Sequence, residues 1–272
     1  MAQEYFDPVL FIKEGAKTPI HLSRTPFFCN LGGFARYFEV PPSGVQLLEP
    51  SISDPMVALG NRYGVRSATT EPTDPRYGEQ TRLEFLADQV EYRPLWATSD
   101  TAAAFGMTLA EPGQGIRITS PQPCLSLVDY KYGMFAGHRS PYLGTGYRLL
   151  PKVCTDLEHH DFPHVFAAVD PHLPLVISVA RYWPQRQEIC LADLWLPRGK
   201  ALYVPPRPRS SEQSCLDLHG NRNSALACWQ GLGQTSVRTQ TLLQTEHSYF
   251  CWFWNDLPTT HPLLDPTGAP HA

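Results

Sequence analysis

The sequence predicts an α+β or mainly β protein, in which an antiparallel meander forms a sandwich or barrel-like core in the C-terminal half, with a few short helices. The chain of 272 residues contains 27 prolines and 19 glycines, which interrupt it every few residues and leave little room for long helices. From residue 164 onward, β-branched and aromatic runs alternate with turn sequences. Hydrophobic residues make up 42% of the chain, enough for a core that folds without metal or disulfide bonds.

The first half of the chain gives weaker signals. Residues 1–75 are rich in proline and glycine, and we expect them to form an irregular lobe or edge extension of one domain that spans residues 1–272. Residues 79–91 predict an amphipathic helix, because their apolar side chains are spaced i, i+3, i+4 and i+7 (Leu83, Leu86, Ala87 and Val90). A shorter helix is expected from Ser99 or Asp100, and another over residues 224–232.

The strand signals are strongest in the second half. Runs rich in β-branched and aromatic residues are typical of strands, and the turn sequences DPH, PQR and PRG separate four of them. The predicted strands are "HVFAAV" (164–169), "LPLVISVARYW" (173–183), "QEICLADLWL" (187–196), "KALYV" (200–204), "LVDYKYGMF" (127–135) and "HSYFCWFWND" (247–256).

Charge and cysteine content limit the partners and the compartment. Lys and Arg number 22 against 26 Asp and Glu, and no basic block is present, so nucleic acid is not an expected partner. No basic start followed by an apolar run marks a signal peptide, and no stretch approaches the roughly 18 apolar residues of a membrane span. The seven cysteines are scattered without a C-x-x-C pair, which predicts reduced thiols and a cytoplasmic location.

The stretch "LEHHDFPHVFAAVDPH", residues 157–172, holds four of the ten histidines. His159 and Asp161 have the H-x-D spacing that supplies two of the three ligands of a non-haem iron site, and His219 in "LDLHGNRNSA" is the natural third ligand. If the chain is extended there, His159 and Asp161 project to one side and His160 to the other. We expect the three ligands to meet at one mouth of the β core.

This arrangement resembles the iron- and 2-oxoglutarate-dependent oxygenases over about residues 155–240. The resemblance implies a double-stranded β-helix core, an Fe(II) ion and 2-oxoglutarate as cosubstrate. That family places an Arg or Lys about ten residues beyond the distal histidine, to hold the cosubstrate carboxylate. This chain departs from the pattern, since Arg222 lies nearer to His219 and Arg238 lies farther away.

Other interpretations of the same residues stay open. His160 and His164, at i and i+4, could bind zinc with Asp170 or His172, although Pro163 between them argues against the helix that this spacing needs. A polar loop that covers the sheet would explain the histidines without any metal. A nucleophilic thiol is a further candidate, with Cys228 activated by His247.

Two segments suggest contacts with a partner. Pro205, Pro208 and Arg209 belong to a P-x-x-P sequence with flanking arginines, which is typical of segments that dock as polyproline II helices. In "SYFCWFW", residues 248–254, both faces of a strand are apolar, so Trp252 and Trp254 lie either in a central strand or on an aromatic binding surface.

Two functions therefore follow from the sequence. The first is a soluble intracellular protein that recognises another macromolecule, expected to be a protein, through aromatic and loop surfaces. The second is a small Fe(II)- and 2-oxoglutarate-type oxygenase that uses His159, Asp161 and His219. An oxygenase must bind one equivalent of iron, whereas an interaction protein need not.

Overall fold

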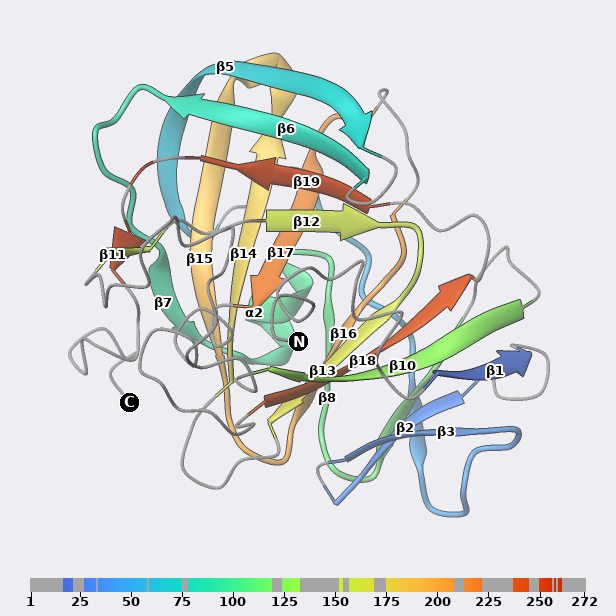
Figure 1. Cartoon of the computed structure of the whole chain (residues 1–272). Coiled ribbons are helices and arrows are strands. Elements are labelled where there is room, and N and C mark those ends of the chain that lie inside the picture. Colours follow the sequence, from blue (N-terminus) through green and yellow to red (C-terminus); the bar gives the residue numbers. More distant parts are fainter. Residues whose placement is uncertain are drawn as a thin grey trace.

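The computed structural model confirms a mainly β fold with very short helices (Figure 1). It describes residues 17–21, 27–32, 34–57, 59–74, 78–118, 124–132, 152–153, 157–168, 175–207, 213–221, 237–244, 250–255, 257 and 259–260. Within this described part, no helix has both the length and the apolar character needed to cross a membrane.

Seven strands close into a barrel. Six of them follow one another as hydrogen-bonded neighbours from β14 to β5, β15 pairs with β5, and the pairing of β14 with β15 closes the ring. In ring order the strands are β14 (Leu175–Trp183), β17 (Leu216–Asn221), β12 (Leu157–His160), β19 (Phe250–Trp254), β6 (Gly78–Phe85), β5 (Asn61–Asp74) and β15 (Glu188–Leu196). Strand β7 (Arg93–Trp96) pairs in parallel with β15 and lies outside the ring.

Apolar side chains fill the barrel. The rings of Tyr182 on β14 and Phe253 on β19 lie 6.3 Å apart, although two strands separate β14 from β19 in the ring, so this contact crosses the interior. Every strand of the ring contributes to the same cluster of buried side chains, which includes Val65, Leu83, Phe85, Leu157, Ala180, Tyr182, Ile189, Leu191, Leu218, Cys251 and Phe253.

Two further sheets lie on one side of the barrel, one beyond the other. The larger has the strand order β1 (Lys17–His21), β10 (Cys124–Tyr132), β18 (Val237–Gln244), β13 (His164–Ala168), β16 (Ala201–Val204) and β8 (Thr108–Ala110). The smaller has the order β3 (Phe34–Phe38), β2 (Phe27–Leu31), β9 (Gln114–Arg117) and β4 (Gln46–Leu48). Strands β11 (Lys152–Val153) and β20 (Thr259–Thr260) form a separate pair.

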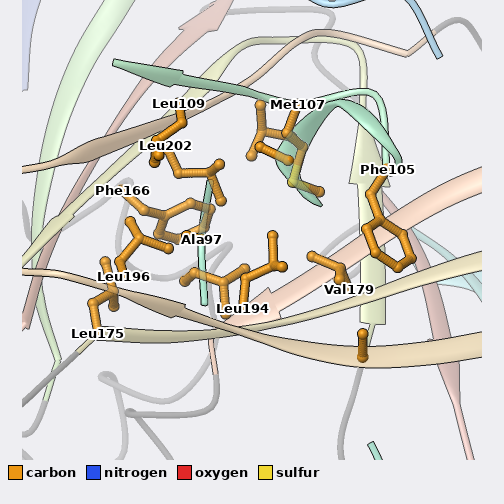
Figure 2. Packing of buried hydrophobic residues seen from close by; sticks show 14 of the residues in the cluster. Ala97, Phe105, Met107, Leu109, Phe166, Leu175, Val179, Leu194, Leu196 and Leu202 are labelled. Carbon is orange, nitrogen blue, oxygen red and sulfur yellow. The ribbon is translucent and has the colours of Figure 1, made fainter. Parts of the chain in front are cut away.

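Each interface between these layers has its own core. The outward faces of β14 and β15 pack against β13, β16 and β8, and Figure 2 shows Leu194 and Leu196 facing Phe166 and Leu202 across this layer. The opposite face of the six-stranded sheet packs on the four-stranded sheet through Phe28 and Ile116. Strand β13 shows the alternation plainly, since Phe166 belongs to the first core, and its neighbours Val165 and Ala167 belong to the second.

The short helix expected near Ser99 is present as α2 (Ser99–Ala103). Its N-cap is Thr98, whose hydroxyl accepts from the backbone N–H of Thr101, while the Thr101 hydroxyl receives the N–H of Thr98. The helix buries Ala102 in the core between the barrel and the six-stranded sheet. The helix expected over residues 224–232 lies outside the described residues.

The helix predicted over residues 79–91 is wrong. Its first half is strand β6, which pairs with β5 and β19 on its two sides. Thr81, Leu83 and Phe85 point inward and are buried, whereas the residues between them are exposed, so the period is two rather than 3.6. Leu86, expected on the buried helical face, is 65% exposed.

The six predicted strand runs all contain strands, namely β10, β13, β14, β15, β16 and β19. Their connections are less simple than a meander, because β14 and β15 form a hairpin in the barrel while β13 pairs with β16 and β18 in the second sheet. The N-terminal region contributes β5 to the barrel and β2, β3 and β4 to the outer sheet.

Candidate metal centre

Four side chains with metal-binding atoms meet in the layer between the barrel and the six-stranded sheet. Glu158 and His160 lie on β12, His164 begins β13, and His219 lies on β17. Side chains alternate along β12, and Leu157 belongs to the core inside the barrel. Glu158 and His160 therefore face outward, toward the second sheet.

A short turn brings His164 to the same place. Residues 161–163 connect β12 of the barrel to β13 of the six-stranded sheet, so the chain changes layer between His160 and His164. His164 stacks on Phe166, which lies two positions along β13 in the same layer, with ring centroids 4.1 Å apart. The i, i+4 spacing of the two histidines thus spans a strand, a turn and a strand, and no helix is needed.

The pairing of β17 fixes the fourth residue. His219 is directly opposite Glu158 on β12 and opposite Val179 on β14. Directly opposite residues in an antiparallel pair share one face of the sheet. His219 therefore faces the same layer as Glu158 and the core residue Val179.

The ligand atoms of Glu158, His160, His164 and His219 all lie within 4.8 Å of one another. Glu158 Oε1 and His219 Nε2 lie 3.6 Å apart. Ligand–metal distances near 2.1 Å place tetrahedral donors about 3.4 Å apart. The separations in the cluster therefore exceed this spacing by at most about 1.4 Å.

A backbone carbonyl two residues along the chain sets the tautomer of His160. Its Nδ1 lies 2.7 Å from the carbonyl oxygen of Phe162, and since a carbonyl only accepts, Nδ1 must carry the hydrogen. In a neutral ring the lone pair is then on Nε2. A hydrogen bond of this kind orients a metal-binding histidine and raises the basicity of the nitrogen that binds the ion.

Burial keeps the three imidazoles neutral. Desolvation lowers the pKa of His160 to about 3, and it lowers the pKa values of His164 and His219 well below 6.5. The neighbouring histidines lower each pKa further, because each disfavours a second positive charge nearby. Neutral imidazole is the form that binds a metal ion, so all three rings are ready to bind at pH 7.

Aromatic rings hold these imidazoles in place. Phe162 stacks on His160 with ring centroids 3.8 Å apart and an interplanar angle of 2°. Phe166 stacks on His164 and also meets the edge of His219 at 5.7 Å. Both phenylalanines are fully buried in the core between the layers. The imidazoles are thus positioned by packing as well as by the backbone.

The residues predicted for an iron site are only partly brought together. His219 lies in the cluster of four, but His159 faces the barrel interior, where its ring lies 5.9 Å from Phe253. Asp161 is partly buried in the turn and is not one of the clustered residues. His160, expected to point away, is in the cluster. The meeting point is the layer outside the barrel wall rather than a barrel mouth.

Sequence reasoning missed Glu158 altogether and ranked His160 and His164 below the H-x-D pair. The signal for Glu158 is its E-x-H spacing with His160, which is equivalent to the H-x-D spacing one position later. The zinc interpretation did join His160 and His164. Its further candidates, Asp170 and His172, lie outside the described residues, as do Cys228 and His247 of the thiol interpretation.

The predicted partner-binding residues are spread over two regions. Trp252 and Trp254 are partly buried on β19, which is a central strand between β12 and β6, and Trp252 packs against the core between the layers. The guanidinium of Arg82 lies 5.3 Å from the Trp254 ring. Pro205 is partly buried, and Pro208 and Arg209 are outside the described residues.

Comparison of the chain with protein-family models, curated proteins and solved structures finds no match. The function is therefore inferred from the chemistry of the four side chains.

Proposed function

We propose that this protein binds one divalent transition-metal ion through Glu158, His160, His164 and His219. The observation that carries the proposal is the approach of these four ligand atoms to within 4.8 Å of one another in a buried layer. Imidazole nitrogens and a carboxylate oxygen are common protein ligands of transition metals, and here three of the first and one of the second converge. A divalent cation supplies the positive charge that such a group of donors would bind.

The donor set selects a class of ions. Imidazole nitrogen suits zinc, iron, nickel and copper, whereas magnesium and calcium prefer oxygen donors. Iron is therefore included among the candidates, and an iron-dependent oxygenase of the kind suggested by the sequence would have to use this donor set in place of His159 and Asp161. Measured iron affinity and its response to substitution at Asp161 decide between this donor set and the set of His159, Asp161 and His219.

Recognition of a partner protein remains a second proposal. Partial exposure of Trp254 and Pro205 supports it, since each offers some apolar surface. A cytoplasmic location is proposed with it, supported by the free thiols of Cys29, Cys190, Cys215 and Cys251. Thiol counting under denaturing, non-reducing conditions checks the compartment, because three disulfides would contradict it.

Equilibrium dialysis of the purified protein against zinc, iron(II), nickel and cobalt(II), followed by elemental analysis, tests metal binding. We expect one equivalent of bound ion, and a loss of affinity of at least 10- to 100-fold in His164→Ala and in the nearly isosteric Glu158→Gln. The matched controls are His159→Gln and Asp161→Asn, which alter neighbours of the cluster and should bind like the parent chain. The proposal would be overturned if the parent chain bound no ion. It would also be overturned if Glu158→Gln and His164→Ala bound the ion as tightly as the parent chain does.

A further inference from the structure

We infer that the bound ion is four-coordinate, is held by protein ligands alone and serves as a structural zinc site that fastens the barrel to the six-stranded sheet. The inference rests on the proposed metal binding and adds the coordination number, the preferred ion and the role. Three features of the described residues support it: the number of donors, their burial and the strands from which they come.

The number of donors matches a closed tetrahedral site. Structural zinc sites take four protein ligands, whereas catalytic zinc sites take three and leave one position for water or substrate. Glu158, His160, His164 and His219 supply four donors in one cluster. Zinc has no geometric preference from its d electrons, so it accepts the tetrahedron that four converging side chains offer.

Burial of the cluster also indicates a closed site. His160 and His219 are each 1% exposed, and Glu158, the most exposed of the four, is 8% exposed. The stacked faces of His160 and His164 are covered by Phe162 and Phe166. A catalytic ion needs a position that a substrate can reach, and among the described residues core side chains cover the imidazole faces.

The donors come from two different layers of the fold. Glu158 and His160 on β12 and His219 on β17 belong to the barrel wall, and His164 on β13 belongs to the six-stranded sheet. An ion bound to all four joins the two layers directly. Free energy of binding to such a site adds to the free energy of folding, because the complete site exists only when the layers are docked.

Cobalt(II) in place of zinc reports the coordination number. Four-coordinate cobalt absorbs visible light intensely, whereas six-coordinate cobalt absorbs weakly. We expect the intense spectrum with one equivalent of cobalt and its retention in His159→Gln. In Glu158→Gln a water would replace the carboxylate, so we expect a shifted spectrum and cobalt binding at least about 10-fold weaker. A spectrum and affinity in Glu158→Gln identical to those of the parent chain would show that Glu158 is not a ligand and would overturn the closed site. One equivalent of cobalt with the weak spectrum would overturn the four-coordinate site while leaving the proposed metal binding intact. Absence of any binding would instead overturn the proposed function.

Zinc-dependent stability reports the role. With free zinc about 1,000 times above Kd, we expect the Tm of the metal-free protein to rise by about 8 to 16 °C. Hydrogen exchange should slow on zinc addition in β12, β17 and β13 together. Slowing confined to β12 and β17, or bound zinc without a rise in Tm, would overturn the fastening of the two layers even though zinc binds.

Discussion

Replacing Arg181 by methionine should lower the free energy of unfolding by about 3 to 5 kcal/mol, the usual cost of breaking a buried ion pair. The side chain of Arg181 is fully buried on β14, and that of Asp217 on β17 is 4% exposed. The Nε of Arg181 donates to Asp217 Oδ1 at 2.7 Å. Methionine resembles the aliphatic stem of arginine but lacks the guanidinium, so the substitution removes this ion pair while it keeps part of the apolar packing.

The remaining contacts set the size of the effect. Arg181 also donates to the backbone carbonyl oxygens of Asp54 and Val57, and these lose a partner in the variant. The carboxylate of Asp217 still accepts from Ser53 Oγ at 2.6 Å and from Arg207 at 3.2 Å. Because these donors stay, we expect a value nearer 3 than 5 kcal/mol, and a fall in Tm of at least about 6 °C.

Urea unfolding followed by tryptophan fluorescence measures this difference. The matched control is Arg62→Met, which removes an ion pair with Glu188 at 3.1 Å whose partners are 53% and 32% exposed. An exposed pair contributes about 0 to 1 kcal/mol. If Arg181→Met cost no more than Arg62→Met, burial would not govern the strength of these pairs, and the reasoning would be refuted.

Three further predictions concern backbone contacts, a buried thiol and a helix cap. Gly60→Ala should destabilise the fold by about 1 to 3 kcal/mol, because the added Cβ would lie 2.3 Å from a backbone carbonyl oxygen. The control Gly64→Ala should cost clearly less, because its Cβ would meet only the exposed, rotatable side chain of Leu86. Comparable urea midpoints for the two variants would refute this. Burial raises the pKa of the Cys190 thiol above its usual 9.0, so the folded state holds this proton more tightly than the unfolded state. The free energy of unfolding should therefore fall as the pH rises past 9, and it should fall less in Cys190→Ala. Thr98→Ala should lower stability by about 1 kcal/mol in thermal unfolding, and an unchanged Tm would show that the cap contributes nothing.

Strands could be predicted from the sequence where composition and tertiary packing agree. The hairpin of β14 and β15 is an example, since both runs are apolar on both faces and both faces are buried, one inside the barrel and one outside. The error at residues 79–91 has the opposite cause. Leu83 and Val90 satisfy a helical spacing, but pairing with β5 and β19 satisfies the backbone of β6 on both sides and selects the period of two.

The candidate site shows a different limit. The period of two correctly places His159 and His160 on opposite faces of the strand. The sequence does not show which of these faces meets the second sheet, because all four residues of β12 are buried and neither face is marked by exposure. Pro163 argues against the helix that would bring His160 and His164 together. The proline does exclude a helix, but a turn that passes from one sheet to another brings the same two residues together.

That turn also limits how the layers can move. Four residue steps separate His160 in the barrel from His164 in the six-stranded sheet, and an extended chain covers at most about 3.6 Å per residue. The two strands therefore cannot part by more than about 14 Å at this corner, whatever happens elsewhere in the interface. A second short connection ties the same layers, since five residue steps lead from Leu196 at the end of β15 to Ala201 at the start of β16. His164 and Ala201 lie at opposite ends of the β13–β16 pair. An opening between the barrel and the second sheet is therefore limited at both corners, by the length of chain that crosses each of them.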